Sequence, residues 1–281
     1  MRHGRKSSSK RFDGHKAAIA VDAESQLIFE VEVLAGNAWA ASDALPLVEN
    51  SEANTGLPVE ETVGDCAYGE GQTRQAFADA QRKLVAKVPN VGRKDQIHKT
   101  EFQIDLAAMT CTCPGGHTTD HRISMGFWPE RHGVKAPKQF FSFPAQTCAA
   151  CPLRAKCVKT EAKRGRTIQL HPQEALLRQA RALQNSATFQ VYRQVRQTVE
   201  HRLARLVQLG IRQARYLGRK KTLFQVLMAA TVANLTLIAT QTGQMRVKTR
   251  LFSLLFVLLN ALQGVVAALS YPFQRWEPCT L

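Results

Sequence analysis

Residues 17–90 alternate short apolar runs with amphipathic segments, and this alternation limits the possible fold more than any other feature. The first two runs flank the polar turn "DAES" and are typical of a β-hairpin, in which Ile28, Val31 and Val33 are interrupted by two glutamates. A helix is expected in "SDALPLVENSEANTG", a strand in "VEETVGDCAYG", a helix in "EGQTRQAFADAQRKL" and a strand in "LVAKVP". This order of elements predicts an α/β fold with a mixed sheet flanked by helices.

The remaining chain divides by composition. Residues 1–16 form a basic, Ser-rich arm without periodicity, which we expect to be mobile. Residues 91–167 lose the apolar periodicity and contain five cysteines, so we expect an insertion that needs another source of order. Helical patterns return in residues 168–240, which would complete the core that begins in residues 17–90. Residues 241–281 read as an apolar helical tail.

Within this tail, residues 251–269 contain no charged residue and follow three basic ones, which is the length and flank of a membrane span. Polar residues such as Asn260 and Gln263 interrupt the run, and its leucines follow the spacing of a core-facing helix. A packed or partner-binding helix is therefore favoured, and a membrane-associated protein remains an alternative.

The chain is strongly basic, with 38 Lys and Arg against 22 Asp and Glu and a formal charge of +16. Such an excess indicates a polyanionic partner, with nucleic acid ahead of an anionic membrane. The first residues, "MRHGRKSSSKRFDGHK", carry no apolar core of a signal peptide, so a reducing cytoplasm is expected. In that compartment clustered cysteines bind metal more often than they form disulfides.

Asp65 follows the apolar end of a predicted strand in "VGDCAYGEG" and precedes two glycines. Ligands of α/β sheets bind outside the carboxyl ends of strands, so a carboxylate at this position points to a site. The alternative is a structural role in which Asp65 closes an Asx-turn.

Glu200 is the second carboxylate of interest. It is the only acidic residue between Tyr192 and Lys221, a segment with nine Lys and Arg, and an ion pair with Arg196 is the structural alternative. Two carboxylates in a basic groove suit Mg²⁺ or Mn²⁺ and phosphoryl chemistry on nucleic acid. The basic residues expected to hold the nucleic-acid backbone are Arg196, Arg202, Arg205, Arg212, Arg215, Arg219, Lys220 and Lys221.

The cysteines form two groups, "CTCPGGH" and "CAACPLRAKC". Such spacings suit a tetrahedral structural Zn²⁺, and the preferred ligands are Cys113, Cys148, Cys151 and Cys157. Cys111 or His117 could replace one of them. Free thiols, or disulfides in an oxidising compartment, are the alternatives.

Five segments together resemble the catalytic half of bacterial insertion-sequence transposases of the DDE class. They are "FDGHKAAIAVD", "VEETVGDCAYGEG", "CAACPLRAKC", "RQTVEHRLARLVQLGIRQARYLGRKKTLFQ" and "AATVANLTLIA", and the similarity covers roughly residues 10–240. The resemblance implies an RNase H-like fold that cleaves and joins DNA at terminal inverted repeats with three acidic residues and Mg²⁺. Asp65 matches the second aspartate of the family, Glu200 the terminal glutamate and Arg196 the arginine four residues before it.

Two departures limit this resemblance. Tyr192 lies four residues before Arg196 instead of three, and Val207 stands where the family has a basic residue. The family places its first aspartate on a strand upstream of "FDGHKAAIAVD", so we expect an N-terminally truncated transposase. Asp13 and Asp22 are the available substitutes, but Asp13 reads as part of the arm and Asp22 as a hairpin-turn residue.

The resemblance further implies a homo-oligomer located in the bacterial cytoplasm at the nucleoid. With two of three carboxylates in view, this chain is expected to bind DNA and to catalyse little or nothing alone. A non-catalytic DNA-binding remnant of a transposase is the leading alternative.

Overall fold

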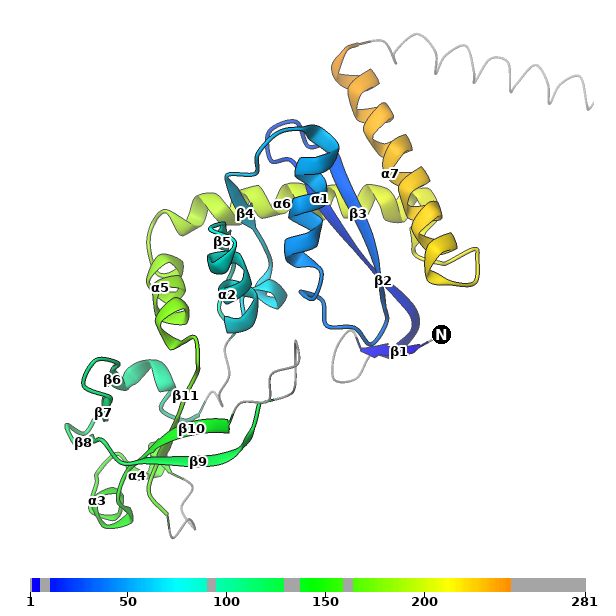
Figure 1. The fold of residues 1–281 in the computed structure, drawn as a ribbon. Coiled ribbons are helices and arrows are strands. Elements are labelled where there is room, and N and C mark those ends of the chain that lie inside the picture. Colours follow the sequence, from blue (N-terminus) through cyan, green and yellow to red (C-terminus); the bar gives the residue numbers. More distant parts are fainter. Residues whose placement is uncertain (1, 6–10, 90–94, 129–136, 159–163, 244–281) are drawn as a thin grey trace, which may run out of the picture.

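A computed structural model of the 281-residue chain describes residues 2–5, 11–89, 95–128, 137–158 and 164–243. It is a mixed α/β structure with several small sheets and long helices toward the end of the described chain (Figure 1). The α/β class expected from the sequence is therefore confirmed. The apolar run at residues 251–269 lies outside the described residues, and its expected packing stays a prediction.

The predicted β-hairpin is present at the start of the chain. Three antiparallel strands follow the order β1-β2-β3, namely β1 (Arg2–Arg5), β2 (Arg11–Val21) and β3 (Ile28–Ala35). Asp22 closes the turn between β2 and β3, because its carboxylate accepts hydrogen bonds from the Ser25 amide at 2.7 Å and the Ser25 hydroxyl at 2.6 Å. The expectation for Asp22 as a turn residue is thus confirmed.

The expectation of an arm without regular structure at residues 1–16 is wrong for its described part. Arg2–Arg5 pair with residues 11–14, so β1 and the first half of β2 fall inside this segment. Backbone hydrogen bonds between the two strands order this polar segment. Its sequence shows no alternation of apolar and polar residues, and a strand would have been predicted only from such alternation.

Two short parallel strands, β4 (Glu61–Val63) and β5 (Lys83–Val85), form a second sheet. The predicted helices are α1 (Ala44–Thr55), which ends at Gly56 with a left-handed φ of 69°, and α2 (Gly71–Asp79), which joins β4 to β5. Phe77 of α2 is almost fully buried against Val48 of α1. The local predictions for residues 42–88 are therefore confirmed.

The single mixed sheet is not confirmed. The β1-β2-β3 sheet and the β4-β5 sheet share no ladder among the described residues. β4 and β5 pair over only three residues each, and β1 pairs with only the first residues of β2. The two sheets are instead related through the helices that cover them.

Three helices complete this region, α5 (Glu174–Gln184), α6 (Phe189–Leu206) and α7 (Arg219–Gln241), as the sequence predicts. α6 runs across both β2 and β4, and α7 lies along β3 (Figure 1). Leu206 of α6 and Val226 of α7 are buried against Val33 of β3. Asn234 joins α7 to the start of β3, because its side chain bonds both the amide and the carbonyl of Ile28.

Among the described residues, α7 is long and apolar enough to cross a membrane by length and composition, with a mean hydropathy of 1.7. One face of α7 packs against β3 and α6, so these properties also suit a core helix. Its other face exposes large apolar side chains, including Phe224, Met228 and Leu235.

Residues 95–170 contain more regular structure than the sequence predicts. Antiparallel pairing gives two small sheets, built from β6 (Gln103–Asp105), β7 (Thr110–Thr112), β8 (Thr118–Thr119), β9 (Arg122–Phe127), β10 (Pro137–Ser142) and β11 (Thr167–Leu170), with the short helices η2 (Lys99–Glu101), α3 (Ala145–Ala149) and α4 (Arg154–Cys157) beside them. Phe102, Phe141 and Ile168 form their shared core. These apolar side chains are a source of order that the cysteine pattern did not reveal.

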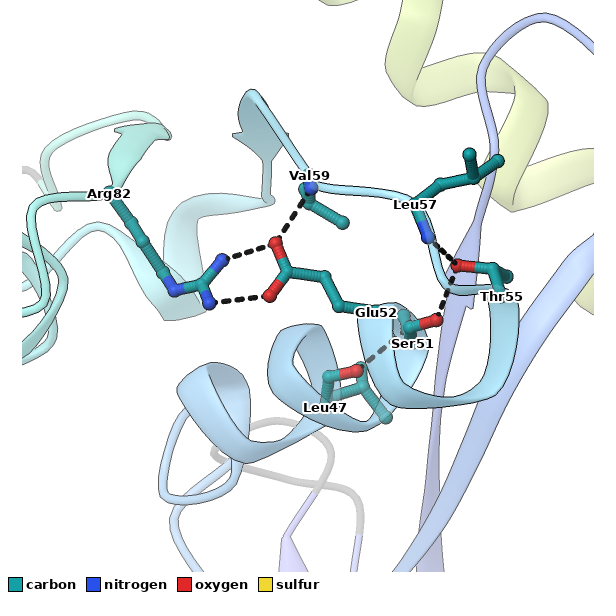
Figure 2. Close-up of polar contacts among 7 residues, drawn as sticks. All are labelled: Leu47, Ser51, Glu52, Thr55, Leu57, Val59 and Arg82. Carbon is teal, nitrogen blue, oxygen red and sulfur yellow. Dashed lines mark hydrogen bonds and ion pairs between the residues drawn. The ribbon is translucent and has the colours of Figure 1, made fainter.

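Glu52 of α1 connects the helix to both short parallel strands (Figure 2). Its carboxylate accepts two hydrogen bonds from the Arg82 guanidinium, at 2.7 and 2.6 Å, and one from the Val59 amide at 2.7 Å. Arg82 immediately precedes β5, and Val59 leads into β4. The bidentate ion pair therefore fixes α1 against the sheet that carries Asp65 at its carboxyl end.

This ion pair predicts a specific acid sensitivity. The Arg82 guanidinium, with help from the Val59 amide, lowers the pKa of Glu52 from 4.5 to about 2. Because the folded-state pKa is depressed, the pair stabilises the fold above pH 4.5, and this stabilisation is lost as the pH falls toward 2. In Arg82→Met, the fall in unfolding free energy over this range, measured by urea titration, should be shallower than in the parent. An unchanged slope would contradict the assignment.

Candidate functional site

Asp65 lies one residue beyond the Gly64 that follows β4, at the carboxyl end of the β4-β5 sheet. Its side chain is exposed, and Oδ1 accepts a hydrogen bond of 2.7 Å from the Ala67 amide, which caps the 3₁₀ helix η1 (Cys66–Tyr68). The structural role considered from the sequence is therefore present. The cap uses Oδ1 of an exposed residue and does not involve Oδ2, so the cap and a ligand are compatible.

The turn that presents Asp65 is fixed by its neighbours. At Gly69 a Cβ atom would lie 1.6 Å from the carbonyl oxygen of Lys87, so only glycine allows this approach. The buried guanidinium of Arg74 donates from Nε to the Gly69 carbonyl at 3.0 Å and from Nη2 to the Ala86 carbonyl. Arg74 is a positioning residue that we did not identify from the sequence, where it reads as one more basic residue on a helix.

Glu200 lies on α6 with its side chain 61% exposed, and it forms the ion pair with Arg196 at 3.0 Å that the sequence suggested as an alternative. An exposed pair at this spacing contributes only a few tenths of a kcal/mol to a helix. Glu200 is therefore held in place weakly and remains accessible to a ligand.

The structure does not join Asp65 to Glu200 by any described contact. Instead, α6 is anchored on β4 eight residues earlier, where the Tyr192 hydroxyl donates to Glu61 at 2.9 Å and Lys83 of β5 pairs with the same carboxylate at 2.6 Å. No group of three or more His, Cys, Asp or Glu side chains within the described ranges has the spacing of a metal site. The helix that carries Glu200 thus packs on the sheet that carries Asp65, without a preformed cluster of acids.

The two substitutes considered for a first aspartate are engaged elsewhere. Asp13 lies on β2 and pairs with His3 of β1. Asp22 is committed to the hairpin turn through Ser25, whose hydroxyl holds the pKa of Asp22 below its usual value. Neither contacts Asp65 or Glu200 through a described interaction.

Most of the predicted basic residues are available to a polyanion. Those at the end of the helical segment are exposed, namely Arg212, Arg215, Arg219, Lys220 and Lys221. Arg196 and Arg205 are half-buried, and Arg205 contacts Gln208. Arg202 differs, because it is only 7% exposed and donates to Asn234 of α7. Its guanidinium connects α6 to α7 and is shielded from solvent, so the prediction that Arg202 contacts DNA is wrong.

The exposed basic residues lie in residues 212–221, called the basic loop here, which includes the first turn of α7. The segment follows the π-helical turn η3 (Val207–Ile211), and glycines with positive φ stand on both sides of its irregular part, Gly210 within η3 and Gly218 before α7. From α7, Gln225 accepts from the Arg215 amide at 2.8 Å and donates to the carbonyls of Gly210 and Gln213 at 3.2 and 3.0 Å. Gln225 was missed from the sequence, where a polar residue inside an apolar helix was the available signal.

The four cysteines predicted as zinc ligands, Cys113, Cys148, Cys151 and Cys157, line one pocket together with His117, and zinc binding there stays a prediction. Cys111, the considered substitute, is fully buried in the adjacent core, where burial raises its pKa to about 11. All six described cysteines are free, so the disulfide alternative finds no support in the described chain.

Comparison with known families bears directly on these residues. Residues 112–239 match the family model of the transposase DDE domain, a range that includes Glu200, the basic loop and the four pocket cysteines, whereas Asp65 lies outside it. The comparisons with curated proteins and with solved structures returned no match. A transposase domain acts on DNA and typically uses a divalent metal ion. Residues 112–239 are therefore similar to the DDE domain of transposases.

Proposed function

We propose that this chain cleaves and joins DNA at the ends of a bacterial insertion sequence, with Asp65 and Glu200 as two of the acidic residues of the site. The observation that carries the proposal is the placement of Glu200, which lies inside the matched transposase domain on a helix that packs against the sheet ending in Asp65. The basic surface beside it supplies the charge that a DNA backbone requires.

The donor set suits magnesium or manganese. Both side chains are exposed carboxylates, which are hard oxygen ligands, and Asp65 keeps one oxygen outside its cap. When bound, the metal ion would stabilise the charge on the scissile phosphate and lower the pKa of the attacking hydroxyl. Arg196 would release Glu200 toward the metal and turn to a phosphate oxygen, since the exposed ion pair costs little to break.

Three finer features belong to the same proposal. An RNase H-like arrangement is supported by the antiparallel β1-β2-β3 sheet, the parallel β4-β5 pair and the helix α6 that crosses both. Terminal inverted repeats are the proposed DNA partner, and the bacterial cytoplasm at the nucleoid and a homo-oligomer are the proposed setting. Structural zinc at the pocket cysteines is also proposed, and it does not depend on the DNA chemistry.

A nicking and strand-transfer assay on DNA that contains insertion-sequence ends tests this function. Metal-dependent cleavage by the parent chain in Mg²⁺ or Mn²⁺ should fall at least about 100-fold in Asp65→Asn and in Glu200→Gln, because each removes a metal ligand. Glu49→Gln, an acid of α1 outside the site, is the matched control and should cut as the parent does. Cleavage that survives in both variants would exclude these carboxylates.

A second candidate, a DNA-binding protein without catalysis, is favoured by one specific observation. No group of three metal-binding side chains is arranged within the described part of the chain, and Asp13 and Asp22 have other partners. In the assay above, this candidate predicts that the parent binds end-containing DNA and leaves it intact at every metal concentration.

Both candidates require phosphate contacts from the basic loop. Replacing Lys220 and Lys221 together with Gln should weaken binding to all DNA sequences alike, and it should reduce the slope of log K against log salt by about 1 for each lost contact. Fluorescence anisotropy over a range of salt concentrations measures this slope. Arg122→Gln on β9, another exposed cation, is the control, and an equal effect in that variant would contradict a local contact surface.

A further inference from the structure

We propose that Cys113, Cys148, Cys151 and Cys157 together bind one zinc ion as thiolates, and that Arg166 positions the site and offsets its charge. The four cysteines come from separate parts of the chain: Cys113 follows β7, Cys148 lies in α3, Cys151 follows α3 and Cys157 ends α4. All four line the same pocket. Cys66, by contrast, is exposed on η1 in another part of the molecule.

Gly115 shows how close two of these sulfurs lie. A Cβ atom at Gly115 would stand 3.3 Å from Sγ of Cys151 and 3.6 Å from Sγ of Cys113. The two sulfurs are therefore no more than about 7 Å apart, whereas thiolates about 2.3 Å from a common zinc stand about 3.8 Å apart. This upper limit includes the spacing that zinc requires, although the described residues do not form a closed metal cluster.

Local backbone turns set the spacing of three of the cysteines. The amide of Cys151 bonds the carbonyl of Cys148, and the amide of Arg154 bonds the carbonyl of Cys151 at 3.1 Å. This succession of turns brings the C-x2-C pair and the start of α4 around one point, so that Cys157 reaches it after one more helical turn. Closing the site then requires small movements within turns and leaves the sheets unchanged.

Arg166 supplies the second, independent observation. Its amide donates to Sγ of Cys148 at 3.4 Å, and its guanidinium donates to the carbonyls of Cys157 and Ile97 at 2.9 and 3.0 Å. The buried Nε of Arg166 has no hydrogen-bond partner in the described chain. A zinc ion with four thiolates carries a net charge of −2, and a half-buried arginine whose buried Nε is a spare donor beside the sulfurs is suited to offset it.

His117 lines the same pocket, with a ring carbon 3.8 Å from the Cβ position at Gly115, and is the competing ligand. The four cysteines are preferred because three of them, Cys113, Cys148 and Cys157, pack against the core of Phe141 and Phe143, so their sulfurs turn inward toward a common region. The site would then fasten β7, α3 and α4 to that core.

Zinc analysis of the full chain tests the assignment without reference to DNA. The parent, purified under reducing conditions, should contain about one zinc per chain and, after exchange, give the sulfur-to-cobalt charge-transfer absorption of a tetrahedral thiolate site. Cys151→Ser and Cys113→Ser should each bind zinc at least about 100-fold more weakly, since even partners outside the ligand set change affinity by 10- to 100-fold. Cys66→Ser and His117→Asn are the matched controls and should keep the metal.

A folded parent chain that retains no zinc and gives no thiolate absorption with cobalt overturns the proposal. So does loss of zinc in Cys66→Ser, and loss in His117→Asn overturns the four-cysteine ligand set. If the serine variants do not fold, cobalt titration of the parent decides alone, because saturation at one equivalent with thiolate absorption identifies the site. Arg166→Lys should keep the metal while weakening its affinity by about 10- to 100-fold, which a purely structural role would not produce.

Discussion

Phe141→Ala is expected to lower the free energy of unfolding by about 4 kcal/mol, because a fully buried phenylalanine leaves a large cavity when it is truncated. Phe141 lies on β10 with no exposed surface, at the centre of the cluster formed with Phe102, Ile104, Phe143 and Ile168. The sheets around it are short, so little neighbouring structure is available to collapse into the space. Urea unfolding followed by circular dichroism measures the change.

Phe224→Ala provides the matched control for this effect. Phe224 lies on α7 with 56% of its surface exposed, and its truncation should change stability by no more than about 0.5 kcal/mol. Equal losses in the two variants would show that burial around Phe141 does not hold this part of the fold together. A separate early transition in Phe141→Ala would show that residues 95–170 unfold independently of the other helices and sheets.

Lys99→Met is expected to cost about 3 kcal/mol, because it leaves a buried carboxylate without its nearest cation. Glu174 opens α5 with its side chain only 3% exposed, and it pairs with Lys99 of η2. Arg181 is the other cation near this carboxylate, at 3.6 Å, which keeps the expected loss below that of a completely unpaired charge. The pair links the cysteine-containing sheets to the helices that follow them.

A double-mutant cycle with Glu174→Gln isolates this interaction. The double variant should recover part of the loss, because neutral glutamine needs no cation. Lys83→Met is the control, since its pair with Glu61 is 59% exposed on the lysine side and should contribute at most about 1 kcal/mol. A loss in Lys99→Met no larger than the loss in Lys83→Met would contradict a buried ion pair.

The elements that the sequence predicted correctly are those with local signals. The β2-β3 hairpin has alternation and a turn closed by Asp22, and α1 ends at Gly56, which adopts the left-handed conformation that favours glycine. The pairing of β1 with β2 and the division into separate sheets depend on backbone hydrogen bonds between distant residues, which no local pattern encodes. The core around Phe141 could not be predicted either. Apolar and polar residues alternate poorly along its strands, and these strands are far apart in the sequence.

At the candidate site, the sequence pattern nominated Asp65, Glu200 and the pocket cysteines, but it did not reveal the residues that contact them. The contact between Tyr192 and Glu61 joins residues 131 positions apart. The burial of Arg202 could in principle be predicted from the sequence. It follows Val199 by three residues and precedes Leu206 by four, so helical geometry places it on the same buried stripe, whereas its charge alone suggested the surface.

The position of α6 has a consequence for how the molecule opens. The helix touches both β2 and β4, and α1 packs on β2 and β3 while Glu52 ties it to the β4-β5 sheet, but the two sheets exchange no described backbone hydrogen bonds. Their relative angle is therefore set by the side-chain contacts of α1 and of α6, a rod of 18 residues about 27 Å long. Side-chain packing of this kind is disrupted more easily than a continuous ladder of backbone hydrogen bonds. Amide hydrogen exchange should thus show two separately protected sheets, with α6 exchanging at the rate of whichever sheet opens last.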